Sequence, residues 1–520
     1  MSAFLAGKRI LLGVTGSIAA YKAADLASKL SQAGAQVDVL LTAAALQFVT
    51  PLTFQSVTGR RVYTDADLWG REGHVQHIGL GQNADLLVVA PASANTIAKL
   101  AHGLADNLLT VTALAARCPL MLAPAMDGGM YAHPATQANL ANLRARGAKI
   151  AGPASGHLAS GLSGVGRLLE PLDLVGHIRR FSGLHGPLRG RLVVATAGGT
   201  QEPIDPVRVI ANRSSGKQGF ALAQAALDLG ARVILISGPT NLPTPVGVER
   251  VDVQTAAEMA EATLQALPGA DMLLMAAAVA DFRPVNPAAQ KIKKQSGPPE
   301  IHLERTPDIL AQVAEYRADH HWPRLSVGFA AETQDLLENA SKKLEAKRLD
   351  LIVANDVSAP DAGFAVETNR VTLLSAGGLT ESLPLMSKDQ VAAAVLEHAL
   401  RLLPAGEPDW IIHLCPAADW QAAQAKGVYR GDTIDTQGFI HFSGPGQVLR
   451  VANTYYRGRR DLLLLWVAPN RLTAELRWEY SDDLLFPHLY GPLNLEAVLA
   501  SQPIIPDNDG IFRSLPGPAA

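Results

Sequence analysis

Two groups of small, polar and basic residues lie close together near the middle of this 520-residue chain. The first, Gly198-Gly199-Thr200, follows an apolar run, and its small residues let backbone N–H groups approach an anion closely. The second, SSGKQG at residues 214–219, precedes a segment of helical periodicity and so combines hydroxyls, a cation and a helix N-terminus. Either group alone is typical of an ordinary turn. Together, with Asn212 just upstream, they predict a site for the phosphate groups of a nucleotide.

A second set of candidate residues lies earlier in the chain. The segment GVTGSIAAYK at residues 13–22 places glycine, threonine and serine between a strand pattern and a helix pattern, where α/β sheets bind phosphate. PASANT (91–96), PAMDGGMY (124–131) and HVQH (74–77) also fall where strands should end. Ordinary roles remain open, with Asn95 as a helix N-cap and His77 as a surface or core histidine.

The elements that must position these residues follow an alternating pattern. Short apolar runs alternate with helical periodicity, which predicts buried parallel strands at 10–14, 37–41, 86–90 and 120–123, and in a second series at 192–195, 232–236, 272–276, 326–329 and 351–354. Beyond a Pro/Gly-rich linker at 404–408 the chain becomes rich in tryptophan. We predict an α/β protein with two doubly wound (Rossmann-like) parallel-sheet domains in tandem plus a small α+β C-terminal domain. The expected domains are 1–190, 191–405 and 409–502, followed by a loose tail at 503–520.

Composition narrows the class of protein. The formal net charge is -3, which gives no general attraction to nucleic acid or to anionic lipid. The two cysteines are far apart, so neither a disulfide framework nor a cysteine metal site is expected. We find no apolar run of about 18 residues and no signal-peptide pattern at the start, and therefore expect a cytoplasmic protein that neither spans nor binds a membrane.

Residues 1 to about 400 resemble the bifunctional phosphopantothenoylcysteine decarboxylase/phosphopantothenate-cysteine ligase family of coenzyme A biosynthesis. The resemblance rests on GSIAAYK, PASANT and HIGL in the first part, and on TAGGTQEPIDPVRVIANRSSGKQG, AAAVADF, KIKK, TPDI, VGFAAET and AND in the second. It implies coenzyme A biosynthesis from (R)-pantothenate. In that reading, CTP-dependent ligation of 4'-phosphopantothenate and cysteine passes through an acyl-cytidylate, and FMN-dependent decarboxylation then gives 4'-phosphopantetheine.

For the first domain, the resemblance implies an FMN site and a catalytic histidine, His77. The residues implied to hold FMN are Gly16, Ser17, Thr42, Ser93 and Asn95. Two positions with implied catalytic roles depart from the family pattern, because Asp127 stands where the family has asparagine and Ser160 where it has a proton-donating cysteine. Ser160 is a far weaker acid than a thiol. The alternative is an active ligase fused to a flavin-binding scaffold or regulatory domain that has lost complete decarboxylase chemistry.

For the second domain, the resemblance implies a CTP site with Mg²⁺ bridging phosphate oxygens. Asn212 would contact the acyl-cytidylate, and Lys291 is the residue that we expect activation to need most. The residues implied to surround CTP are Met275, Ala276, Ala277, Asp281, Lys291, Thr306, Pro307, Asp308, Ile309, Phe329, Lys343 and Lys347. Alone, KIKK is typical of a solvated basic loop, and NADP binding is the competing hypothesis, which the missing GxGxxG weakens.

The last part of the chain resembles a family of unknown function, and we assign it no reaction. His413, His441 and His488 could form a metal or substrate cluster, but their spacing matches no known ligand signature, so separate structural roles are favoured. The related flavin domains form trimers and the ligase domains form dimers, so the resemblance implies a homo-oligomer.

Overall fold

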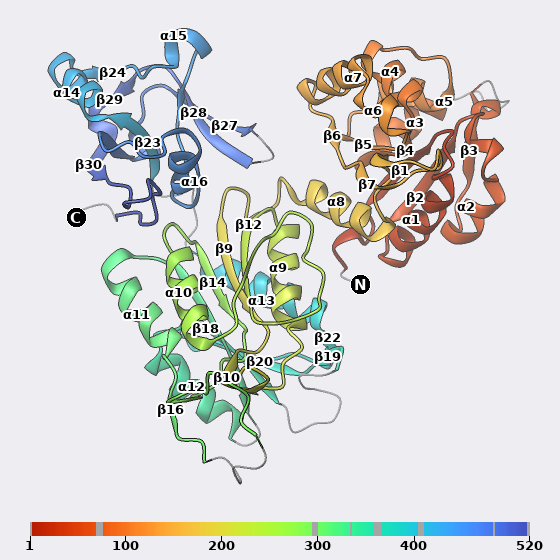
Figure 1. Cartoon of the computed structure of the whole chain (residues 1–520). Helices are drawn as coiled ribbons and strands as arrows, with labels where there is room; N and C mark the ends of the chain where they lie inside the picture. The colour runs from red at the N-terminus through yellow and green to blue at the C-terminus, as the bar shows by residue number, and fades with distance from the viewer. Residues whose placement is uncertain are drawn as a thin grey trace. The chain divides into compact units, whose positions relative to one another are not determined.

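The structure is a computed structural model, and it describes residues 3–68, 76–293, 300–332, 335–356, 366–403, 410–481 and 484–516. The chain divides into two compact units, Met1–Gly183 and Leu184–Ala520, which are described separately. Figure 1 shows the first unit from red to yellow and the second from yellow to blue. No helix in the described ranges combines the length and the apolar character that a membrane span requires.

The first unit is built on a six-stranded parallel sheet with the order β3-β2-β1-β4-β5-β6. Its strands are β1 (Arg9–Val14), β2 (Gln36–Leu41), β3 (Val62–Thr64), β4 (Leu86–Ala92), β5 (Leu120–Pro124) and β6 (Lys149–Ile150). All four predicted strands are present, and β4 is buried along its whole length because helices cover both faces. This order reverses between β1 and β4, which places a ligand crevice at the carboxyl ends of those strands.

The helices of the first unit connect and cover these strands. They are α1 (Ala20–Gln32), α2 (Pro51–Thr58), α3 (Gln76–Asn83), α4 (Ala94–His102), α5 (Leu108–Ala115), α6 (Gly128–Ala132), α7 (Pro134–Ala145) and α8 (Pro171–Gly183). A separate antiparallel hairpin, β7 (Ala154–His157) with β8 (Ser163–Arg167), lies against the loop after β5: the backbone N–H of Met126 donates to the carbonyl of Gly166 at 3.0 Å.

The second unit contains an eight-stranded sheet with the order β13-β12-β9-β14-β17-β18-β20-β21. The strands are β9 (Leu192–Ala197), β12 (Arg232–Ser237), β13 (Glu249–Asp252), β14 (Met272–Met275), β17 (Leu325–Glu332), β18 (Leu351–Asp356), β20 (Val371–Ser375) and β21 (Thr380–Ser382). The five predicted strands are present and parallel, whereas β20, which was not predicted, runs antiparallel to β18, and β21 runs antiparallel to β20. A short turn joins β20 to β21, and such a turn can only connect antiparallel neighbours.

Helices bury both faces of this sheet. One apolar cluster includes residues of α9 (Lys217–Asp228) and α13 (Lys388–Leu402), and the other includes residues of α10 (Ala256–Ala266), α11 (Ile309–His320) and α12 (Leu336–Ala346). Short strand pairs stand outside the sheet: β10 (Gln201–Asp205) with β11 (Arg208–Ala211), β15 (Phe282–Pro284) with β16 (Leu303–Arg305), and β19 (Thr368–Asn369) with β22 (Met386–Ser387). The link between the two predicted phosphate elements is a hairpin, β10–β11, which the sequence patterns did not predict.

The C-terminal part is the predicted small α+β structure. One antiparallel sheet has the order β23 (Ile411–Pro416), β26 (Leu462–Val467), β30 (Val498–Ile504), and a second has the order β25 (Ile440–His441), β28 (Leu484–Tyr490), β27 (Glu475–Ser481). The pair β24 (Val428–Tyr429) and β29 (Leu493–Asn494) and the helices α14 (Ala417–Lys426), α15 (Ile434–Gln437) and α16 (Pro445–Tyr455) complete it.

The expectation of a loose tail from residue 503 is wrong for its described part. Phe512 and Leu515 are each only 2% exposed and belong to an apolar cluster with α16 and β26. The Asn453 side chain fixes this end, because it donates to the carbonyl of Phe512 at 2.9 Å and accepts from its N–H at 2.8 Å. Residues 517–520 lie outside the described ranges.

Candidate functional site

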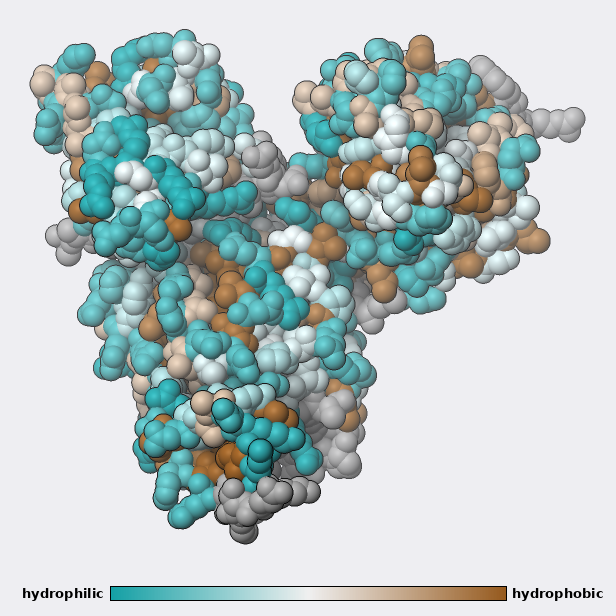
Figure 2. Space-filling model, in the orientation of Figure 1, coloured by the Kyte–Doolittle hydropathy of each residue, from teal (hydrophilic) through white to brown (hydrophobic). Residues whose placement is uncertain are grey.

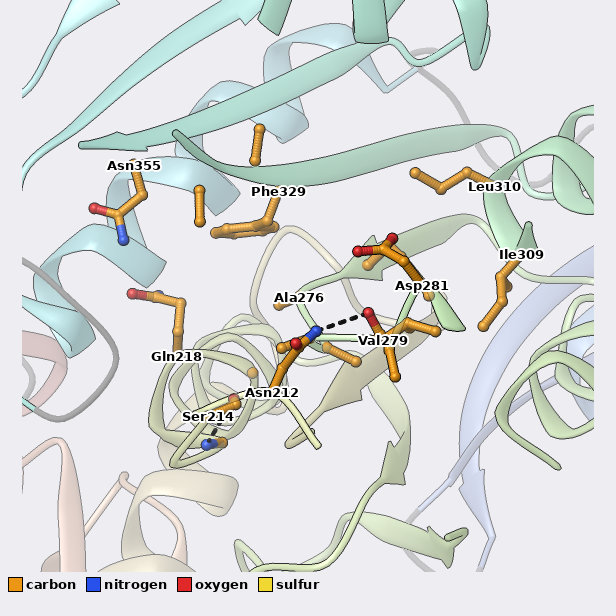
Figure 3. A pocket seen from close by; sticks show the side chains of 18 of the residues that line it. Asn212, Ser214, Gln218, Ala276, Val279, Asp281, Ile309, Leu310, Phe329 and Asn355 are labelled. Carbon is orange, nitrogen blue, oxygen red and sulfur yellow. Dashed lines mark hydrogen bonds between the residues drawn. The ribbon is translucent and has the colours of Figure 1, made fainter. Parts of the chain in front are cut away.

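A cavity of about 900 Å³ lies at the carboxyl edge of the second sheet. It is bounded by the segment that follows β14, by the last residues of β17 and by the start of α9, where ligands sit in parallel sheets. Figure 3 shows Asn212, Asp281 and Phe329 around this space, each from a different part of the chain. The cavity is large enough for a nucleotide-sized ligand.

The glycine-rich loop after β9 does not itself line the cavity, but it is joined to the loop after β14, which does. The N–H of Ala278 donates to the carbonyl of Gly198 at 2.8 Å, and Gly199 forms a parallel bridge with Ala278. The buried Thr200 hydroxyl accepts from the N–H of Ala280 at 2.9 Å. Gly198 has φ +78, and a Cβ there would lie 3.0 Å from the Gly238 carbonyl oxygen, so this turn requires glycine. The AGGT and AAAVAD segments, far apart in sequence, are therefore one structure.

The start of α9 reaches the same place through a close contact with β9. A Cβ on Gly219 would lie 2.5 Å from the Thr196 carbonyl oxygen and 2.5 Å from the Ala197 Cβ. Glycine at this position lets the helix N-terminus approach the sheet edge. Its first N–H groups have no intrahelical partner, which suits an anion.

The residues predicted to surround CTP are brought together in this cavity, with one exception. Asn212 also lines the cavity, and its side-chain N–H donates to the carbonyl of Val279 at 2.9 Å, as Figure 3 shows. The predicted nucleotide residues that line the cavity are Met275, Ala276, Ala277, Asp281, Thr306, Pro307, Asp308, Ile309, Phe329, Lys343 and Lys347. The structure shows that these residues are neighbours, and what they bind remains a prediction.

Two of these lysines are held by defined partners. Lys343 donates to the carbonyl of Phe329 at 3.1 Å, and Lys347 forms an ion pair with Asp308. Burial would raise the pKa of the Asp308 carboxyl, but the hydrogen bonds from Lys347 and from the N–H of Ala311, with the charge of Lys343, lower it on balance. Asp308 is therefore ionised at neutral pH, and a bound polyphosphate would compete with it for the lysines.

Lys291 is the exception. Its residue is exposed and is not among those that line the cavity. Among the described residues its ammonium has no hydrogen bond or ion pair. Lys294, the last residue of KIKK, lies outside the described residues.

Sequence reasoning missed two residues that also line the cavity, Asn369 and Lys388. The Oδ1 atom of Asn369 is buried and has no hydrogen-bond partner in the described part of the chain. Burial and the nearby charge of Lys217 lower the pKa of Lys388, while Glu367 opposes this. No local pattern could have singled out Lys388, because it follows Ser387, which forms an ordinary capping box at the start of α13.

In the first unit, the predicted flavin residues gather at the carboxyl edge of the sheet. Gly16 follows β1, and a Cβ there would lie 2.6 Å from the Ala44 Cβ, in the loop that follows β2. Thr42, in the same loop, is 7% exposed and accepts from the N–H of Ala45 at 3.3 Å. Ser93, not Asn95, is the N-cap of α4. Ser17 and Asn95 stand at the same edge, after β1 and β4.

Thr15 is the threonine of GVTGSIAAYK, and although it was not among the residues implied to hold FMN, it joins two of these loops. Its buried hydroxyl donates to the carbonyl of Pro91 at 2.7 Å and accepts from the N–H of Ser93 at 2.9 Å. Small residues and hydroxyls at one sheet edge fit the phosphate of a flavin nucleotide.

The surface of the first unit also carries exposed hydrophobic residues, as Figure 2 shows. Next to the predicted flavin residues, the side chains of Ile18 and Tyr21 are 61% and 63% exposed.

The two residues that depart from the family pattern contact each other. Ser160, at the tip of the β7–β8 hairpin, donates from Oγ to Oδ2 of Asp127 at 2.7 Å. The other carboxylate oxygen accepts from the N–H of Gly129 at 2.9 Å and caps α6. These hydrogen bonds, that of Ser160 first, lower the pKa of Asp127, which is therefore ionised. A carboxylate at residue 127 thus has a hydroxyl donor at residue 160.

His77 stands in the first turn of α3, which begins at the carboxyl edge because crossover helices run back along parallel strands. Its side chain has no hydrogen bond to any other described residue. His74 lies outside the described residues.

The three C-terminal histidines are neighbours, but each has its own partner. His413 is buried and donates from Nδ1 to the carbonyl of His441 at 2.7 Å, while its Nε2 lies 2.8 Å from the Tyr429 hydroxyl. Burial lowers the pKa of His413 to about 4. His441 and His488 have ring centroids 4.9 Å apart, and His488 is held by Glu479 at 2.8 Å. Within the described ranges, no group of three or more potential ligands could hold a metal ion.

Comparison with known proteins assigns the chain. The family model "Flavoprotein" matches residues 2–183, and the model "DNA/pantothenate metabolism flavoprotein C-terminal domain" matches residues 188–402. The coenzyme A biosynthesis bifunctional protein CoaBC of Bacillus subtilis (strain 168) is 48% identical over 401 residues, which cover 76% of this chain and 98% of that protein. The chain belongs to the bifunctional CoaBC family. The Mycobacterium tuberculosis (strain ATCC 25618 / H37Rv) protein of the same name is 46% identical over 408 residues, covering 76% of this chain and 97% of that protein.

Solved structures that resemble the chain correspond to its separate parts. The C-terminal domain of a CoaBC is 41% identical and covers 42% of this chain and 97% of its own, with a TM-score of 0.36. The FMN-binding protein AtHal3 is 36% identical and covers 34% of this chain and 96% of its own, with a TM-score of 0.31.

Membership of the CoaBC family establishes a bifunctional enzyme of coenzyme A biosynthesis, with an FMN-dependent decarboxylase part and a ligase part. The alternative of a ligase fused to an inactive flavin scaffold is not favoured. Residues 414–501 match a protein family of unknown function, DUF952, outside the region shared with these CoaBC proteins.

Proposed function

We propose that the cavity of the second unit binds CTP and 4'-phosphopantothenate and joins the latter to cysteine. The observation that supports this proposal is that eleven of the twelve residues implied to surround CTP, and Asn212, line the same cavity. In the first half-reaction the substrate carboxylate attacks the α-phosphorus of CTP and pyrophosphate leaves. In the second, the cysteine amine attacks the acyl-cytidylate carbonyl, and CMP leaves with formation of the amide.

The residues of the cavity suit this chemistry. Lys343 and Lys347 stand where they can neutralise triphosphate charge, and the α9 N-terminus presents N–H groups to an anion. Lys291 would join them when the nucleotide is bound. In the described part of the chain no carboxylate cluster forms a metal site, so we expect Mg²⁺ to enter with the phosphates of the nucleotide. Asn212 would hold the acyl-cytidylate.

For the first unit, we assign the FMN phosphate to the edge formed by Gly16, Ser17, Thr42, Ser93 and Asn95. Bound FMN supplies a two-electron oxidation of the substrate thiol, which creates an electron sink for decarboxylation, and it returns those electrons afterwards. His77 would act in the decarboxylation. The Asp127–Ser160 pair would close the β7–β8 hairpin over the substrate, with Ser160 at its tip.

The remaining proposals concern organisation. We propose domains at 1–190, 191–405 and 409–502, a cytoplasmic location, and a homo-oligomer with a trimeric flavin part and a dimeric ligase part. The exposed apolar side chains of the first unit, such as Ile18 and Tyr21, support association through that unit.

The ligase proposal can be tested without cysteine. Purified protein given CTP, Mg²⁺ and 4'-phosphopantothenate should release about one pyrophosphate per site, and mass spectrometry should detect the acyl-cytidylate. Pyrophosphate release that does not depend on 4'-phosphopantothenate would overturn the proposal.

A further inference from the structure

The segment that carries Lys291 is anchored to the β10–β11 hairpin. Asp205 and Arg208 occupy facing positions of that hairpin and form an ion pair, with Arg208 Nε 2.9 Å from Asp205 Oδ2. Both also bind the residue that follows Lys291. The N–H of Ile292 donates to Asp205 Oδ2 at 3.1 Å, and Arg208 Nη2 donates to the Ile292 carbonyl at 3.1 Å. The ion pair therefore holds both polar groups of one backbone residue.

A second anchor lies just before the lysine. The N–H of Ala288 donates to the carbonyl of Ile204 at 2.9 Å, so the backbone around Lys291 is fixed at two points to the end of β10. Lys291 does not line the cavity, so its side chain must turn toward it when the nucleotide binds. With a fixed backbone, that movement is limited to rotations of the side chain, which lowers the entropic cost of ordering it.

The charges of Asp205 and Arg208 also leave the Lys291 ammonium able to bind a triphosphate. Asp205 is 2% exposed, and its carboxylate is fully engaged: Oδ1 accepts from the N–H groups of Val207 and Arg208 at 2.9 and 3.0 Å, and Oδ2 accepts from Arg208 and Ile292. The Arg208 guanidinium holds the pKa of the Asp205 carboxyl far below its usual range, although burial opposes this. A carboxylate neutralised in this way does not compete with a triphosphate for the Lys291 ammonium.

We infer that Asp205 is a positioning residue of the ligase, which acts by holding the backbone at Ile292 and so presenting Lys291 to the nucleotide triphosphate. The inference rests on the role proposed for Lys291. Asp205 itself would touch neither CTP nor the substrate.

Asp205→Asn keeps the side-chain volume but removes the charge that pairs with Arg208. We expect kcat/KM for CTP to fall about 10- to 100-fold, the range that corresponds to losing a hydrogen bond to a charged group. Flavin content and decarboxylation of supplied substrate should not change. Glu202→Gln is the matched control, because Glu202 is also 2% exposed on β10 but accepts from the N–H of Ala256 at 2.8 Å, away from Lys291.

Double substitution separates positioning from a structural role. If Asp205 acts through Lys291, Asp205→Asn should cause no further loss in a Lys291→Ala background. Ile292→Pro removes the N–H that donates to Asp205 and should reproduce the loss, which keeps the test valid if Asp205→Asn does not fold. The inference is overturned if Asp205→Asn and Glu202→Gln have the same kcat/KM for CTP. It is also overturned if Asp205→Asn lowers kcat/KM by the same factor in the Lys291→Ala background as in the unchanged protein. Full activity of Lys291→Ala alone would instead refute the role proposed for that lysine.

Discussion

The close contact at Gly219 allows a quantitative prediction for Gly219→Ala. The new Cβ would lie 2.5 Å from the Ala197 Cβ, whereas carbon atoms in contact are about 3.5 Å apart, so the start of α9 must move by about 1 Å. Overpacking of this kind costs about 1–3 kcal/mol of stability, which leaves the protein folded. A displacement of about 1 Å at a reacting centre lowers a rate about 100-fold. We therefore expect kcat/KM for CTP-dependent ligation to fall about 100-fold.

Pyrophosphate release measures this loss, and the unfolding midpoint measured by circular dichroism shows that the variant is folded. The matched control is Gly377→Ala in the turn between β20 and β21, where a Cβ would meet its nearest atom, Ser375 Oγ, at 3.7 Å. The control should keep nearly full activity. If folded Gly219→Ala is as active as Gly377→Ala, the approach of α9 to β9 does not position the nucleotide site, and the reasoning is refuted.

Three further predictions concern the other parts of the chain. Gly16→Ala should lower the flavin absorbance per purified protein about tenfold, because its Cβ would lie 2.6 Å from the Ala44 Cβ; normal absorbance would exclude that contact as part of the FMN site. Ser160→Ala removes a donor from Asp127 and should slow decarboxylation about tenfold with ligation unchanged, as mass spectrometry of both products would show; equal rates would refute a role for the pair. Burial lowers the pKa of His413 to about 4, against 6.5 for the ordinary group, so the unfolded chain binds a proton at this residue before the folded one does. The free energy of unfolding therefore keeps its full value above pH 6.5 and falls by about 3 kcal/mol as the pH decreases toward 4. Urea unfolding followed by tryptophan fluorescence should show this decline, and His413→Gln should reduce it.

Sequence patterns predicted the central parallel strands, because each is an apolar run that helices cover on both faces. The parallel strands β3, β6 and β13 were not predicted, because they are short and no residue in them is fully buried. The β10–β11 hairpin was missed because its sequence contains Pro203 and Pro206, which are unfavourable for a central strand but acceptable in an isolated pair. The burial of Phe512 could not be predicted either, since it depends on Asn453, a residue distant in sequence.

The candidate sites, too, could be predicted only where the residues have a local sequence signature. The AGGT and SSGKQG segments were identified because they occur together, although each alone is typical of a turn, and the structure joins AGGT to AAAVAD. Lys388 and Asn369 have no local signature, because only the tertiary fold brings them to the cavity. The contact between Ser160 and Asp127 likewise requires the hairpin to fold back over the loop after β5.

One time course tests the central claim, that this chain carries both reactions, most directly. Purified protein with bound FMN is given 4'-phosphopantothenate, cysteine, CTP and Mg²⁺, and the products are followed by mass spectrometry. We predict that the cysteine adduct appears first and is then converted to 4'-phosphopantetheine with loss of one CO₂. Accumulation of the adduct without loss of CO₂, or failure to form it, would contradict the account.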